Sequence, residues 1–346
     1  MAEQKKGLGV FEKYLTLWII VCIIVGLLIG RIFPWLGPMV DEWQVFQISV
    51  PIAIVIFLIL FPVFVTARLE RMKDVFRYPF PTTVATILVW VVKPLVMFAM
   101  AGLILAQYPG YAAGITILGV APCTILTLYW SMFARANMGY AIALAALYTV
   151  IIAIVYAPYA SWLAGMYVDV PMGMVFFTAF AFLILPLGLA VIIRRHLYNQ
   201  GRLDWLEQDV APILKKISTV AILALLILLF TLQGEHIINR PGTTLLVAAP
   251  FLITMYLMFA VTIGINLLLR IPYELAVVII LMAASQHFEV AIGVASTVFG
   301  LDAPETFATV VGPLFEIPVM LSMAHILLKV RHKFTSMLPE SEKTQA

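Results

Sequence analysis

The chain alternates between long apolar runs and short polar connectors. Ten runs of spanning length lie at about 15–33, 45–66, 82–106, 111–133, 138–165, 171–193, 213–233, 243–269, 274–298 and 306–329. An α-helix needs roughly 20 such residues to cross the hydrocarbon core of a bilayer. Only helices can span as separate segments, because the backbone must satisfy its own hydrogen bonds in lipid. The pattern therefore predicts an all-α membrane protein with ten transmembrane helices in one transporter domain, residues 1–346.

Composition supports a bilayer setting and argues against several other classes. Hydrophobic residues make up 63% of the chain and charged residues 11%, whereas a soluble domain is about half apolar and a quarter charged. The net charge of +3 is carried by short basic clusters between apolar runs, so we expect no nucleic-acid partner. No phosphate loop or metal motif is present, and we expect no cofactor. No cysteine–histidine–acid arrangement is convincing by spacing, so we do not expect an enzyme.

The basic residues also predict the orientation of the helices. With the N-terminus in the cytoplasm, 18 of the 21 Lys and Arg residues fall on inner segments, and only Arg31 and Arg240 fall on outer ones. Lys93 remains inside the third run. Such a division follows the positive-inside rule. We therefore expect a multi-pass protein of the plasma membrane with both termini cytoplasmic, ending in a polar tail, residues 331–346, that is disordered after Lys333.

Ten helices divide into two sets of five, residues about 14–166 and about 170–330. Because each set has an odd number of spans, the two sets would lie in opposite orientations, as in many secondary transporters. An offset of about 165 residues places the segment around Pro122 and Cys123 on Gln286–Glu289. The sequence thus predicts two inverted five-helix repeats.

The middle of the fourth run reads Ala121-Pro122-Cys123-Thr124. Proline removes a backbone hydrogen bond and clashes with the preceding turn, and the freed carbonyl needs a polar partner at membrane depth. The segment predicts an interrupted fourth helix. An ordinary kink with Cys123 as a small packing residue is the alternative, and that is how we interpret Cys22 in its uniformly apolar run.

The middle of the ninth run is unusually polar and reads Ser285-Gln286-His287-Phe288-Glu289. A charged residue at the centre of a span costs roughly 2.5–3.5 kcal/mol on insertion scales, so such residues are functional by default. A carboxyl at this depth can bind and release a proton, as a proton-coupled carrier requires. We therefore expect an interrupted ninth helix with Glu289 as a proton site.

Two further ionisable residues lie inside apolar runs. Glu316 is flanked by Pro313 and Pro318 in the tenth run. It is either a second proton site or a structural acid tied to freed backbone groups. Lys93 precedes Pro94 in the third run, where it needs a carboxylate or carbonyl partner unless it snorkels to the interface. Glu289 and Glu316 are its candidate charge partners.

These motifs resemble the arsenite permeases of the arsenical resistance three family, within the bile acid/arsenite/riboflavin transporter superfamily. The likeness runs in order along nearly the whole chain and is carried by FEKYLTLWIIVCIIVGLLIG (11–30), VPIAIVIFLILFPVF (50–64), and AASQHFEVAIGVASTVFGL followed by TFATVVGPLFEIPVML (283–321). The resemblance implies two inverted repeats whose discontinuous helices 4 and 9 cross at the midplane. It also implies that Cys123 and Glu289 are the essential pair, and that Glu316 is the family's acid in the tenth span.

The chain departs from the family pattern beside that pair. Pro122 stands where the family usually has arginine, and Ser131 where it has asparagine. Gln286 and His287 replace two asparagines, and Lys93 stands where a glycine is usual. These changes leave the substrate range and the coupling ion open.

Together these features predict a secondary active transporter that exports trivalent arsenite, with antimonite as a second substrate, in exchange for protons. Cys123 would contact the arsenic transiently, since trivalent arsenic favours soft thiolate ligands, and Glu289 and Glu316 would carry protons. The remaining candidate binding residues are Pro122, Thr124, Ser285, Gln286 and His287. The alternative is a sodium- or proton-coupled carrier of an organic anion, of the bile acid symporter type. The oligomeric state stays open.

Overall fold

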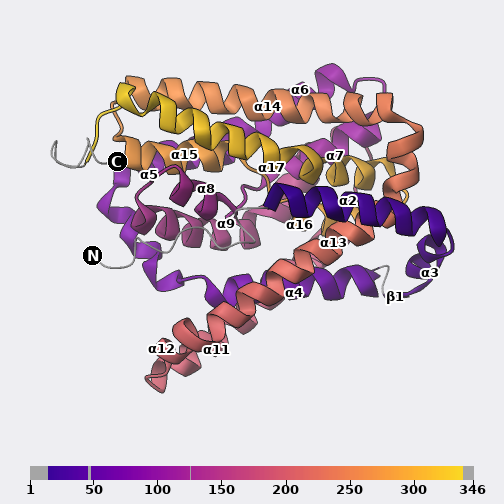
Figure 1. The fold of residues 1–346 in the computed structure, drawn as a ribbon, viewed down its shortest axis with the longest axis horizontal. Coiled ribbons are helices and arrows are strands. Elements are labelled where there is room, and N and C mark those ends of the chain that lie inside the picture. Colours follow the sequence, from indigo (N-terminus) through magenta and orange to yellow (C-terminus); the bar gives the residue numbers. More distant parts are fainter. Residues whose placement is uncertain (1–14, 46–47, 125, 338–346) are drawn as a thin grey trace.

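The computed structural model describes residues 15–45, 48–124 and 126–337 and is helical almost throughout (Figure 1). Two short strands, β1 (Gln44–Val45) and β2 (Ile48–Ser49), pair antiparallel. The helices are α2 (Leu15–Ile32), α3 (Leu36–Glu42), α4 (Val50–Thr66), η1 (Leu69–Arg77), α5 (Pro79–Ile87), η2 (Leu88–Val92), α6 (Lys93–Ile104), α7 (Pro109–Val120), α8 (Leu126–Phe133), α9 (Met138–Ala164), α10 (Met172–Ala179), η3 (Phe180–Ile184), α11 (Leu185–Asn199), α12 (Leu203–Trp205), η4 (Leu206–Val210), α13 (Ala211–Asn239), α14 (Pro241–Leu268), α15 (Tyr273–Ala284), α16 (Phe288–Phe299), α17 (Pro304–Val330) and η5 (Arg331–Lys333).

Within the described residues, seven helical segments are long and apolar enough to cross a membrane. They are Pro79–Ile104, Met138–Ala164, Met172–Asn199, Leu203–Gly234, Pro241–Leu268, Tyr273–Phe299 and Pro304–Lys333. An eighth candidate is α4 with η1, which are bent by 58° relative to each other, and α7 is a shorter apolar helix. The predicted all-helical membrane architecture is therefore confirmed. The second apolar run differs at its start, because the strand ladder precedes a helix that begins at Val50.

Three widened helical turns each precede a proline near the start of the next helix. The π-helical turns η2, η3 and η4 run directly into α6, α11 and α13, in which the second residue is Pro94, Pro186 and Pro212. Proline has no N–H and its ring clashes with the carbonyl of the residue four positions earlier. A π turn relieves this clash, and such turns occur often at functional sites. The first of them positions Lys93.

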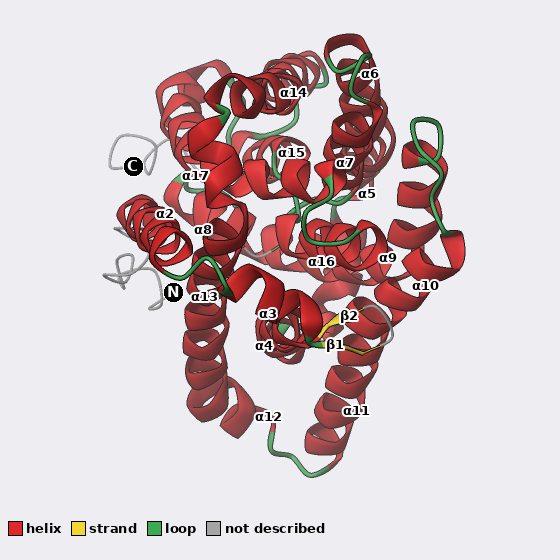
Figure 2. Cartoon of the chain, turned by 90° about the vertical axis from the view of Figure 1, so that its right-hand side faces the viewer, coloured by secondary structure: helices red, strands yellow, loops and turns green. Residues whose placement is uncertain are grey.

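The helices form two groups (Figures 1 and 2). In the first group, the panel, α13 packs against α2 and α4, and α4 packs against α11. The second group, the bundle, contains α6, α7, α14, α15, α16 and α17, with α9 packed on α7. Gly26 and Gly30 allow α2 to lie close to α13, since a Cβ atom there would lie 2.7 Å and 2.4 Å from backbone oxygens of α13. The panel meets the bundle where α4 contacts α16.

The segment from α15 through most of α16 is enclosed by protein. All residues from Tyr273 to Thr297 are buried, whereas only a third of the apolar window within Leu203–Gly234 is. Non-helical backbone at membrane depth is tolerated only where protein or a cavity surrounds it. This burial explains how an interruption can occur in the middle of the segment.

The residues that follow α17 pack against the start of α15. The backbone N–H of Tyr273 donates to the Thr335 carbonyl at 2.8 Å. The Glu274 carboxylate accepts from the Ser336 hydroxyl at 2.7 Å and from the Met337 N–H at 2.9 Å. The expectation that the chain is disordered after Lys333 is therefore wrong for Phe334–Met337, because Glu274 supplies acceptors that fix the backbone there.

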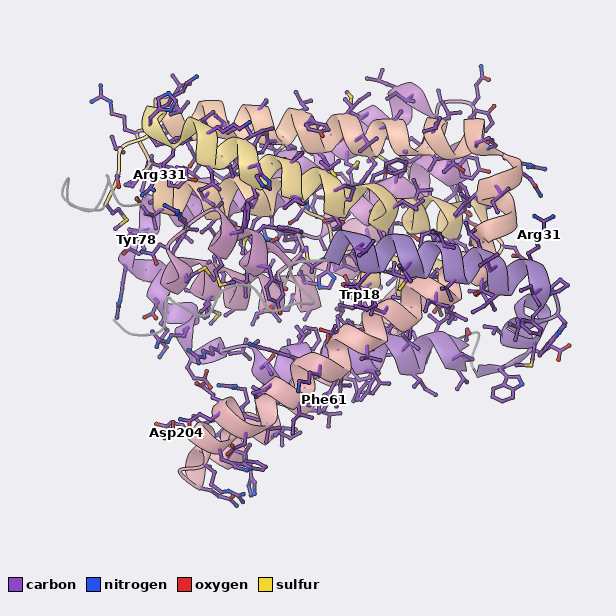
Figure 3. All side chains as sticks on the ribbon, viewed as in Figure 1. Trp18, Arg31, Phe61, Tyr78, Asp204 and Arg331 are labelled. Atoms are coloured by element: carbon purple, nitrogen blue, oxygen red, sulfur yellow. The ribbon has the colours of Figure 1, made fainter. Side chains whose placement is uncertain are left out.

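Three residues labelled in Figure 3 mark the two ends of the long axis of the molecule. Arg31 lies at one end of the long axis, and Tyr78 and Arg331 lie toward the other (Figure 3). The predicted cytoplasmic location of the chain termini concerns residues 1–14 and 338–346, which lie outside the described residues.

Candidate functional site

The two predicted helix interruptions are present, and they meet. Helix α7 ends at Val120 and Ala121 is extended, with φ −104° and ψ 140°. Helix α15 ends at Ala284 and Ser285 is extended, with φ −89° and ψ 159°. The backbone N–H of His287 donates to the carbonyl of Ala121 at 3.0 Å. Each break therefore satisfies a backbone group that the other has freed.

The hydroxyl of Ser285 connects the two breaks. Its Oγ accepts a hydrogen bond from the N–H of Cys123 at 3.2 Å. The hydroxyl of Thr127 lies 3.1 Å from Ser285 Oγ and 2.6 Å from the carbonyl oxygen of Cys123. Ser285 and Thr127 are both buried. The backbone around Cys123 is thus held by hydrogen bonds from both sides.

Lys93 reaches the same place from α6. Its ammonium donates to the carbonyl oxygen of Ser285 at 3.0 Å, and the side chain is 0% exposed. Sequence reasoning named two carboxylates as its candidate charge partners, Glu289 and Glu316. The structure gives it a hydrogen bond to a main-chain carbonyl and an electrostatic interaction with Glu316. A lysine this deep cannot snorkel, because no part of its side chain reaches the surface.

Glu316 lies opposite the next peptide of the break. Its Oε1 accepts from the N–H of Gln286 at 2.8 Å, while its Oε2 is buried and has no hydrogen-bond partner among the described residues. The side chain of Gln286 repeats this pattern, since Nε2 donates to the Ala284 carbonyl at 3.3 Å and Oε1 has no partner. One carboxyl oxygen of Glu316 therefore holds the backbone of the break, and the other is free to bind a proton or a ligand.

His287 and Glu289 form a buried pair beside these contacts. The imidazole Nδ1 lies 2.9 Å from Glu289 Oε2, and the two residues are 2% and 1% exposed. A contact this short between a ring nitrogen and a carboxyl oxygen requires a hydrogen on one of them. Glu289 lies in the first turn of α16, where the unpaired N–H groups favour negative charge.

The two cysteines have different surroundings. Cys123 lies inside the first break, 1% exposed, between Pro122 and Thr124, and it precedes the N-terminal end of α8. Cys22 packs in the hydrophobic core from α2, as the sequence predicts. Neither forms a disulfide. The structure thus gathers Cys123, Ser285 and Lys93 at the crossing and pairs Glu289 with His287.

A cavity of about 610 Å³ lies between panel and bundle and reaches the first break at Thr124. Its walls are mainly apolar and aromatic, and three basic side chains line it, Arg68, Lys215 and His325. The other lining residues are Pro62, Val63, Thr66, Ala67, Leu126, Leu128, Tyr129, Trp130, Met132, Phe133, Met138, Ile142, Ala145, Ala146, Thr149, Ser218, Thr219, Ile222, Leu223, Ile317 and Leu321. Sequence reasoning did not find this cavity, because its walls come from five separate helices.

Thr127 was also missed as a site residue. The available signal was its position, four residues after Cys123 in an apolar run, which lets its hydroxyl reach the Cys123 carbonyl. By contrast, Ser131, one of the departures noted above, is 0% exposed and its hydroxyl has no hydrogen-bond partner.

Comparison with known proteins decides the family. The model of the Sodium Bile acid symporter family matches residues 53–240. The chain belongs to the sodium bile acid symporter family. It is 33% identical to an uncharacterized transporter of Synechocystis sp., over 94% of this chain and 91% of the relative. It is 30% identical to the arsenical-resistance protein Acr3 of Alkaliphilus metalliredigens, over 99% of both chains. It is 29% identical to the Acr3 protein of Corynebacterium glutamicum, over 92% of this chain and 88% of the relative.

These matches confirm the resemblance drawn from the motifs. As a member of this family with several membrane-spanning helices, the chain is a multi-pass membrane transporter. The crossing of the two breaks therefore lies in a protein that moves a solute, and its residues are the candidates for binding that solute.

Proposed function

We propose that this transporter exports trivalent arsenite from the cytoplasm in exchange for protons. The proposal rests on the buried thiol of Cys123 at the meeting of two broken helices, with the hydrogen-bonded pair His287 and Glu289 at the same crossing. The likeness to two arsenical-resistance proteins over almost their whole length supports the choice of substrate. Antimonite, which has the same valence and thiophilicity, is the second substrate.

We further propose ten spans in two inverted repeats with both termini cytoplasmic. Helix α2, helix α4, and the broken pair α7 and α8 would add three spans to the seven long apolar segments. The distribution of basic residues supports this orientation. In that orientation Arg68 and Lys215, which line the cavity, would belong to cytoplasmic segments, and the cavity would open toward the cytoplasm.

The proposed chemistry needs one thiol. Arsenous acid is uncharged at neutral pH, and the sulfur of Cys123 would displace one of its hydroxyl groups. The As–O bond breaks as the S–As bond forms, and the displaced hydroxyl leaves as water with the thiol proton. Among the described residues, no group of three His, Cys, Asp or Glu side chains could hold a metal ion. A single sulfur contact suits a carrier, since the substrate must also leave.

Proton exchange would use the buried acids. The Glu289 carboxyl, which His287 contacts at 2.9 Å, would bind a proton from one side of the membrane and release it to the other. Protonation from outside would accompany release of arsenite there, so the proton gradient would drive export. The unpartnered Oε2 of Glu316 provides a second place for a proton.

The cavity favours a second candidate function. A volume of about 610 Å³ with aromatic walls and three basic side chains is far larger than arsenous acid requires. Ligand pockets for drug-sized molecules span roughly 300–1,000 Å³. An amphipathic organic anion would fit, coupled to sodium as the family description indicates or to protons. Sodium-dependent uptake that is indifferent to Cys123→Ala would favour this function.

Arsenite uptake into everted membrane vesicles tests the main proposal. Vesicles with the wild-type chain should accumulate arsenite when a proton gradient is imposed. Cys123→Ala and Glu289→Gln should each strongly reduce accumulation, while Cys22→Ala, which changes a packing cysteine in α2, should leave it intact. Full accumulation by both of the first two variants would refute the proposal.

A further inference from the structure

The C-terminal end of α15 lies inside the protein and presents its last carbonyl groups to the break. The end of a helix is the negative end of its dipole, and its last four carbonyls have no partner within the helix. In transporters with broken helices, such ends and the unwound carbonyls beside them bind cations. The break after Ala284 is therefore a place where a positive charge is stabilised.

Side chains of the protein already occupy these carbonyls. The Met282 carbonyl accepts from Ser285 Oγ at 3.3 Å, and the Ala284 carbonyl accepts from Gln286 Nε2 at 3.3 Å. The first carbonyl beyond the helix, that of Ser285, accepts from the ammonium of Lys93 at 3.0 Å. Lys93 is the only one of these donors whose side chain can carry a full positive charge.

The charges around the Lys93 ammonium come from three elements. Helix α17 contributes Glu316, whose Oε1 binds the N–H of the next residue, Gln286, and whose Oε2 has no partner. The first break contributes Cys123, which also interacts electrostatically with Lys93. The third is the negative end of α15 itself. The Ser285 carbonyl contacts the Lys93 nitrogen, and Glu316 interacts with it electrostatically, while the lysine side chain is 0% exposed.

We propose that the ammonium of Lys93 serves as a built-in cation at this break, so that the carrier works without sodium. Removal of the side chain would leave the Ser285 carbonyl and the Glu316 carboxylate facing a space that the lysine had filled. Oxygen ligands of this kind suit a hard cation, and sodium from the solution would then occupy the site. Lys93 is a positioning residue in this account, because it holds the break and does not itself touch arsenite.

The first test measures sodium binding without any transport. The purified chain in detergent is heated in sodium chloride and in choline chloride at equal ionic strength. The wild type should unfold at the same temperature in both salts. Lys93→Ala should be stabilised by sodium in a saturable way, by about 2–4 °C at a concentration well above Kd. Lys215→Ala, which changes a lysine lining the cavity, should unfold at the same temperature in both salts and is the matched control.

The second test measures transport and rests on the proposed function. Arsenite accumulation by the wild type should be equal in sodium and choline, and Lys93→Ala should accumulate arsenite only when sodium is present. Saturable stabilisation of the wild type by sodium would overturn the inference, and so would a folded Lys93→Ala protein that ignores sodium. If Lys93→Ala cannot be purified, Lys93→Ser is judged by the same two outcomes. If the sodium pattern holds but the wild type moves no arsenite, the proposed function fails and the built-in cation stands.

Discussion

The imidazole Nδ1 of His287 lies 2.9 Å from the carboxyl Oε2 of Glu289, and both residues are almost completely buried. The first residue ends the break and the second lies in the first turn of α16. A hydrogen must lie between the two atoms, so the contact fixes the ring of His287 and the carboxyl of Glu289 relative to each other.

Replacing Glu289 should separate folding from proton coupling. Glu289→Gln keeps an acceptor for the His287 ring but cannot release a proton, so the fold should persist while accumulation driven by a pH gradient falls about tenfold or more, which corresponds to about 1.4 kcal/mol. Glu289→Ala should also unfold at a lower temperature, because His287 loses its partner at a cost of about 1–3 kcal/mol. Vesicle transport and thermal unfolding together check both variants, and equal behaviour of the two would contradict the pairing.

Substitutions of Glu316 should also separate protein stability from proton coupling, for a different reason. Its Oε1 holds the N–H of Gln286, so Glu316→Ala leaves a buried donor unpaired at a cost of about 1–3 kcal/mol. Glu316→Gln retains an acceptor and should stay near wild-type stability while its proton site is lost. Thermal unfolding distinguishes the variants, with the exposed Glu42→Ala as a control. Normal proton-driven export by Glu316→Gln would show that this acid is structural alone.

The sequence indicated where the two breaks lie but not what joins them. Pro122 and the polar residues from Ser285 onward are local signals of interruption, and local signals can be recognised in a single chain. The Ser285 hydroxyl contacts Cys123 and Thr127, about 160 positions earlier in the chain. These contacts follow from how the helices cross. Lys93 illustrates the limit, since its bonded partner is a carbonyl that only the break makes available.

Other features escaped prediction for a related reason. The cavity is bounded by residues from helices scattered along the chain, so no segment carries a signal of it. The packing of Phe334–Met337 could not be predicted from the polar composition of the tail. It depends on hydrogen bonds to Glu274 at the start of α15, a residue distant in the sequence. The charge pattern, by contrast, is a property of the sequence alone and still supports the proposed orientation.

Helix α7 approaches α17 so closely at Gly114 that a larger residue should not fit there. A Cβ atom there would lie 2.2 Å from the backbone oxygen of Glu305, and backbone cannot move aside easily. Gly114→Ala should therefore destabilise the protein by about 1–3 kcal/mol, as overpacking does. Gly264 in α14 has open space beyond its Cα, so Gly264→Ala should be neutral or stabilising by up to about 1 kcal/mol. Thermal unfolding of the two variants compares them directly, and similar losses would contradict the close approach.

The segment that follows α17 should stabilise the start of α15. Truncation after Lys333 removes the acceptor for the Tyr273 N–H and both donors to the Glu274 carboxylate. A buried carboxylate left without its hydrogen-bond donors costs about 1–3 kcal/mol, and Glu274 is 5% exposed, so the truncated chain should unfold several degrees lower. Truncation after Met337 keeps all three contacts and is the matched control. Adding Glu274→Gln to each truncation completes the test. It should weaken the chain that ends at Met337 more than the one that ends at Lys333, where both hydrogen-bond donors are gone and only the ion pair with Arg331 at 3.9 Å remains. An equal loss in both would show that Glu274 acts independently of the segment.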